Sequence, residues 1–114
     1  MTNATNAYAE LAKRLEGKGI GSYFQNSEML VVSNQNPAMP DSNTFWVTNR
    51  GGQWYLSTWM PAVYQVPKDR DVVEICEIVF RSSEKALYTI DAPIALDLNL
   101  RLLSDDEATE LGLD

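Results

Sequence analysis

The segment Thr44–Pro67, with the sequence TFWVTNRGGQWYLSTWMPAVYQVP, constrains the fold of this chain more than any other. It contains all three tryptophans, and two runs of alternating polarity flank the pair Gly51-Gly52. This pattern predicts a tight β-hairpin, because the favoured two-residue turns require residues that tolerate positive φ angles. We therefore expect this hairpin to form the centre of the core.

A two-residue turn at the glycines fixes the register of this hairpin. It places Val47 opposite Leu56 and Asn49 opposite Trp54. Because side chains alternate along a strand, the two strands then have two distinct faces. The first is an apolar core face with Phe45, Val47, Trp54 and Leu56. The second mixes aromatic rings with hydroxyl groups and carries Trp46, Thr48, Tyr55, Ser57 and Trp59.

The remaining elements follow from apolar spacing, turn residues and helix-capping patterns. We expect helices over residues 6–16 and 69–81, a first hairpin over residues 20–33, short strands at 63–66 and 87–90, and a short helix that begins after Ser104 and ends at Gly112. Residues 1–5 are expected to be disordered, and residues 34–43 to form a loop. For residues 94–103, alternating leucines favour a strand and Pro93 favours a short helix, so both remain open.

The order helix, hairpin, hairpin, helix, two strands and helix predicts one α+β domain over residues 1–114. We expect a two-layer sandwich, in which an antiparallel meander of about four to six strands packs against two main helices and a short C-terminal helix. This order of elements, together with the acidic charge, resembles the small acidic secretion chaperones of the type III class. The resemblance lies in layout and charge, with no shared motif, and it implies a chaperone-like role.

Composition argues against several classes of function. The chain contains no histidine and a single cysteine, Cys76, so it lacks the commonest general base and metal ligand and cannot form an internal disulfide. We therefore expect no catalytic residue, no metal and no cofactor, and a location in the reducing cytoplasm. The formal net charge of -7 argues against nucleic acid and anionic membranes as partners. No apolar run is long enough to span a bilayer.

The aromatic face of the hairpin is the strongest candidate for a binding site. Trp46, Tyr55 and Trp59, extended by Tyr64, would surround a ligand or form an interface patch. The alternative is that another element covers these rings and makes them a second core, as is usual for large aromatic residues. Cys76 lies on the apolar stripe of the second main helix, which predicts a buried, unreactive thiol.

These features favour a small, acidic, non-catalytic protein-interaction module or adaptor, which binds a protein partner or forms a homodimer through the aromatic face. A second hypothesis is a small-molecule-binding domain or an enzyme, with a pocket lined by the same rings. A third is a chaperone-like protein or inhibitor that binds a basic partner through its acidic surface. The sequence does not distinguish a flat aromatic patch from a pocket.

Overall fold

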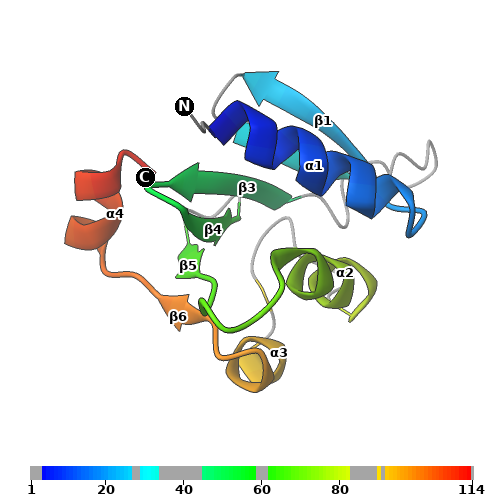
Figure 1. Ribbon diagram of the computed structural model, residues 1–114. Coiled ribbons are helices and arrows are strands. Elements are labelled where there is room, and N and C mark those ends of the chain that lie inside the picture. The colour runs from blue at the N-terminus through cyan, green and yellow to red at the C-terminus, as the bar shows by residue number, and fades with distance from the viewer. Residues whose placement is uncertain are drawn as a thin grey trace.

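The described strands form one antiparallel sheet in which each strand pairs with the next one along the chain. The computed structural model describes residues 4–26, 29–33, 45–58, 62–82, 90 and 92–113 (Figure 1). The strands are β1 (Gly21–Asn26), β2 (Met29–Ser33), β3 (Phe45–Arg50), β4 (Gln53–Ser57), β5 (Val63–Gln65) and β6 (Arg101–Leu102). The helices are α1 (Ala4–Glu16), α2 (Val72–Ser82), α3 (Ala92–Asp97) and α4 (Asp105–Leu111). The prediction of an α+β fold built on an antiparallel meander is confirmed.

The glycine hairpin has the predicted register, including Asn49 opposite Trp54 across β3 and β4. Gly51 and Gly52 have φ angles of 61° and 85°, in the left-handed region that side chains with a Cβ atom disfavour. The Asn49 side chain accepts a hydrogen bond from the Gly52 amide at 3.1 Å. The two glycines and this asparagine therefore close the turn that was expected from the sequence.

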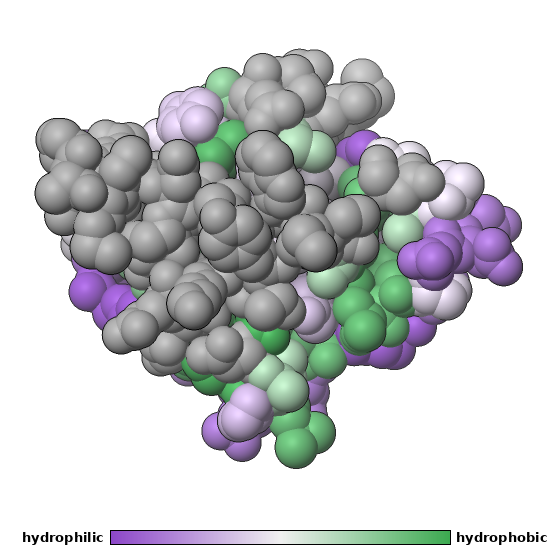
Figure 2. Space-filling model, turned by 180° about the vertical axis from the view of Figure 1, so that it is seen from behind, coloured by the Kyte–Doolittle hydropathy of each residue, from purple (hydrophilic) through white to green (hydrophobic). Residues whose placement is uncertain are grey.

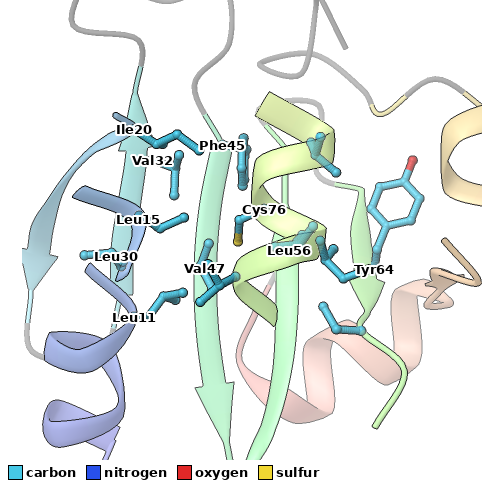
Figure 3. Close-up of a cluster of buried hydrophobic side chains, with 14 of the residues drawn as sticks. Leu11, Leu15, Ile20, Leu30, Val32, Phe45, Val47, Leu56, Tyr64 and Cys76 are labelled. Carbon is cyan, nitrogen blue, oxygen red and sulfur yellow. The ribbon is translucent and has the colours of Figure 1, made fainter. Parts of the chain in front are cut away.

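The main core lies between the sheet and the helices α1 and α2, which cover the same face (Figure 1). Leu30, Val47 and Leu56 stand opposite one another on neighbouring strands and point to this face. Figure 3 shows how their side chains meet those that α1 and α2 contribute. The fully buried residues of this core include Tyr8, Leu15, Ile20, Leu30, Val32, Phe45, Val47, Leu56, Ile75, Cys76 and Val79.

A smaller apolar cluster lies on the other face of the sheet, where α4 packs. Its buried members are Tyr55, Val63, Leu103, Ala108 and Leu113. The capping pattern predicted for this helix is present, since the Ser104 hydroxyl accepts from the Glu107 amide and the Glu107 carboxylate accepts from the Ser104 amide. Gly112 ends the helix with a φ angle of 71°, also as predicted. Seen from behind, hydrophilic residues gather at the side of the molecule where α4 lies (Figure 2).

Residues 94–103 divide into a helix and a very short strand. Pro93 lies in the first turn of α3, a position that suits its missing amide hydrogen. Asn99, with a φ angle of 56°, ends the helix in the left-handed region, and the Leu100 amide donates to the Ala95 carbonyl at 2.9 Å. These two local signals prevail over the alternation of leucines, which had favoured a strand for most of this segment.

Some other boundaries differ from the expected ones. The second main helix begins at Val72 rather than at residue 69, because the Asp71 side chain accepts from the Val73 amide at 3.0 Å and thereby caps it. The first helix begins at Ala4, inside the segment that was expected to be disordered. Residues 1–3, the expected loop 34–43 and residues 87–89 of the expected strand 87–90 lie outside the described residues. Of the helices that the structure describes, none is long and apolar enough to cross a membrane.

Candidate functional site at the open edge of the sheet

The structure separates the aromatic residues that the sequence grouped into one candidate site. Tyr64 stands opposite Leu56 and belongs to the main core (Figure 3). Tyr55 points to the opposite face of the sheet, where it packs in the smaller cluster with α4. Both tyrosines are only 7% exposed. Trp46 is half-buried on the same face as Tyr55, and Trp59 lies outside the described residues. Tyr55 and Tyr64 therefore cannot line the same pocket.

Two shallow grooves flank Trp54, which stands at the margin of the main core. One has a volume of about 210 Å³ and lies between α1 and α2, and the other has about 480 Å³ and lies beside the glycine turn. The ring of Trp54 packs edge-on against Tyr8, with 5.4 Å between the ring centroids. At the rim, Arg14 donates to the Asp71 carboxylate at 2.6 Å and holds the pKa of that carboxyl below its usual value. This ion pair joins α1 to the beginning of α2, so a structural role accounts for both charges.

The buried thiol of Cys76 offers no nucleophile. The residue has no exposed surface, and desolvation raises the pKa of the thiol to about 12. Since the thiolate is the reactive form, this cysteine is inert in the folded protein, as the sequence predicts. In the part of the chain that the structure describes, histidine, cysteine and carboxylate side chains form no group of three or more that could hold a metal.

The most distinctive surface is the edge of the sheet formed by β1. Among the described strands, β1 pairs only with β2, so its other side presents backbone N–H and C=O groups that no described strand pairs with. Natural edge strands are usually protected by charged residues or proline, but β1 has the sequence GSYFQN, with neither. Tyr23 is 53% exposed and Phe24 is 44% exposed. Because they are consecutive, they place an aromatic ring on each face of the edge.

The opposite edge, β6, is built differently. It contains only Arg101 and Leu102, so it offers little backbone for pairing. The Arg101 guanidinium donates to Gln65 at 2.8 Å and to Glu107 at 2.9 Å, which anchors the strand to β5 and α4. Leu102 is 59% exposed and gives this edge one apolar side chain. Only β1 therefore combines a long, uncharged edge with exposed aromatic residues among the described strands.

A groove of about 470 Å³ lies beside this edge, between α1 and β1. The wall formed by α1 carries residues spaced three and four apart, and two of them are alanines that leave room for a guest side chain. The residues lining the groove are Ala9, Ala12, Lys13, Glu16, Ile20, Gly21, Ser22 and Phe24. In Figure 1, α1 lies over one face of β1, and residues of both elements line the groove.

Tyr8 fixes the position of α1 over this edge. Its hydroxyl accepts a hydrogen bond from the Asn49 amide of β3 at 2.6 Å. Its ring also contacts Phe24 edge-on, with 6.1 Å between the centroids. A fully buried tyrosine thus ties the helix both to the sheet centre and to the edge strand, so the groove has a defined shape.

A free strand edge beside a helix-walled groove can bind an extended segment of protein. The backbone of the added strand would pair with β1, and its alternate side chains would enter the groove. The sequence predicted the hairpin that contains β1 but gave no signal that β1 ends the sheet, since this depends on which strands pair with one another. The exposure of Tyr23 and Phe24, which marks this edge, is seen only in the structure.

Comparison of the chain with known proteins finds no matching family model, no matching curated protein and no matching solved structure.

Proposed function

We propose that this protein is a non-catalytic protein-interaction module that binds an extended protein segment along the free edge of β1. The observation that carries the proposal is the outer side of β1, which no described strand pairs with and which has no charged residue or proline, with Tyr23 and Phe24 exposed on its two faces. Exposed aromatic residues often anchor protein interfaces, and strand addition supplies affinity through main-chain hydrogen bonds.

The groove between α1 and β1 supports this mode of binding over a flat contact. A strand added to β1 would direct every second side chain toward Ala9 and Ala12, whose small side chains leave the space that the guest would fill. The side chains between them would lie on the other face, next to Tyr23. Specificity would therefore come from the residues that fit the groove, and the backbone pairing would tolerate many sequences.

The chemistry of the chain supports binding rather than catalysis. It has no histidine, and its one cysteine is buried with its pKa raised to about 12, so a histidine-assisted nucleophile is not available within the chain. The absence of an internal disulfide fits a protein of the cytoplasm, and the net charge of -7 disfavours nucleic acid as the partner.

Selection from a library of random peptides displayed on phage tests the proposal. Peptides that bind the immobilised protein are titrated against the wild type and against the double variant Tyr23→Lys, Phe24→Lys, which places charges on the edge. We expect the affinity of the selected peptides to fall by at least about tenfold in the double variant. The matched control Leu102→Lys changes an exposed apolar residue on the opposite edge and should leave the affinity unchanged.

The site of binding decides the outcome. Chemical-shift changes centred on residues 21–26 and on the α1 residues that line the groove would support strand addition. Selected peptides that bind the double variant as tightly as the wild type, or that perturb the surroundings of Trp54 instead, would refute it.

A further inference from the structure

We infer that the segment that occupies the β1 edge comes from a second copy of this chain, so that two β1 strands pair antiparallel around a two-fold axis at Tyr23. The inference rests on the proposed function, because it names the partner of the same edge. Symmetric pairs of identical chains are the commonest oligomers, and their interfaces must be self-complementary.

The alternation of side chains restricts the possible registers. A two-fold axis normal to the sheet keeps the helix-covered faces of both copies on the same side, so residues that stand opposite each other must share a face. The axis must therefore pass beside a residue and not between two residues. An axis beside Tyr23 pairs the regular part of β1 with its copy. An axis beside Phe24 would include the residues where the pairing of β1 with β2 is irregular, between Phe24 and Asn26.

This register matches large residues with small ones. With Tyr23 opposite its own copy, Ser22 stands opposite Phe24 of the second copy. Both lie on the face that α1 covers, because Ser22 pairs with Val32 and Phe24 pairs with Leu30 of the main core. The ring of Phe24 from each copy would therefore enter the groove of the other copy, above its Ser22. A groove of about 470 Å³ has room for one phenylalanine side chain.

The charges at the groove favour a second copy over a basic partner. The chain has a net charge of -7, which by itself would predict a basic partner, but the helical wall of the groove carries one lysine and one glutamate, Lys13 and Glu16. An identical copy brings the same lysine and glutamate, whose charges cancel, so the groove wall itself does not repel a second acidic chain. The exposed rings of Tyr23 would meet on the other face of the sheet as a cross-strand aromatic pair.

The formation of disulfides between introduced cysteines tests this register directly. In the variant Tyr23→Cys, the two introduced thiols would lie directly opposite each other, at a separation that a disulfide can bridge. In Phe24→Cys the introduced thiols would not face each other, and in Leu102→Cys they would lie on the opposite edge. Native Cys76 is buried and will not contribute. We expect Tyr23→Cys to form covalent dimers at least about tenfold faster than either control under mild oxidation.

Light scattering on the reduced protein gives the second measurement. We expect the wild type and the control Leu102→Lys to have twice the 12.8 kDa mass of one chain, and the variant Tyr23→Lys, Phe24→Lys to have the mass of one chain with an unchanged circular dichroism spectrum. The cysteine variants keep the test independent of whether this double variant folds.

The combined results distinguish a failure of the dimer inference from a failure of the proposed function. A wild type that stays monomeric, while selected peptides still bind at β1, would overturn the second copy as the partner and leave the proposed function intact. A dimer that survives the double variant and does not cross-link at Tyr23→Cys uses another surface and would also overturn the inference. Peptides that bind away from β1 would refute the proposed function itself.

Discussion

Replacing Gly51 and Gly52 with valine tests the turn on which the sheet is built. Both glycines have positive φ angles, and no heavy atom lies within 4 Å of the Cβ position that a side chain would add at either site. The free-energy cost of the substitutions therefore comes from the backbone conformation that valine disfavours, and not from a clash of the added side chains. A residue with a Cβ atom costs about 1–2 kcal/mol in the left-handed region, so the double variant should lose roughly 2–4 kcal/mol of its free energy of unfolding.

Urea denaturation followed by tryptophan fluorescence measures this loss. With a slope of about 1–3 kcal/mol/M for a small domain, the midpoint should fall by roughly 0.7–4 M. Two control variants isolate the cause. Gly51→Asn should cost far less, because asparagine tolerates the left-handed region. Gly17→Ala should be nearly neutral, since an added Cβ would lie 3.5 Å from the Arg14 carbonyl oxygen, an ordinary contact.

A double-valine variant with an unchanged midpoint would refute the reasoning, because the turn would then not require positive φ angles. If Gly51→Asn lost as much free energy of unfolding as the double-valine variant, the reasoning would be refuted as well. The loss would then come from adding a side chain and not from the backbone conformation.

Four further predictions concern Tyr8, the Asp71–Arg14 ion pair and Cys76. Tyr8→Phe removes the acceptor of the Asn49 amide and should cost about 1–3 kcal/mol of unfolding free energy in urea titrations. Asp71→Ala should cost about 1 kcal/mol more than Arg14→Ala, because Asp71 also caps α2 whereas an exposed ion pair contributes little. The pKa of Asp71 is lowered by Arg14, so the stabilisation by this carboxylate is complete above its ordinary pKa of 3.8, and the difference between wild type and Asp71→Asn should disappear as pH falls through the lower folded value. Cys76 should react with a thiol reagent at least about a hundredfold faster in denaturant than in the folded protein.

Local signals made much of the fold predictable. The glycine pair determines the register of β3 and β4 by itself, and the Ser104 and Gly112 caps determine the ends of α4. Where two local signals conflicted, the stereochemical one prevailed. The left-handed Asn99 and the helix-starting Pro93 made residues 92–97 a helix, although the leucines from Leu96 to Leu102 alternate with polar residues.

The candidate site was much less predictable, because it depends on pairings between segments far apart in the sequence. Tyr64 was grouped with Tyr55 by aromatic character, but β4 and β5 pair in a register that turns the two tyrosines to opposite faces of the sheet. The edge position of β1 follows from the order of all the strands. No local pattern around Tyr23 and Phe24 contains that information.

Amide hydrogen exchange in β1 tests the central claim most directly. In an antiparallel ladder, the backbone groups of successive residues point alternately to the two sides of the strand, so those of Gly21–Asn26 that point away from β2 have no strand partner among the described residues. Residue-resolved exchange is compared between two states of the β1 edge. The edge is empty in dilute protein, and it is occupied in concentrated protein or in the presence of a saturating selected peptide. We predict that protection increases at every second amide of β1 when the edge is occupied. Exchange in β1 that is unchanged by occupancy, with new protection elsewhere in the chain, would contradict strand addition.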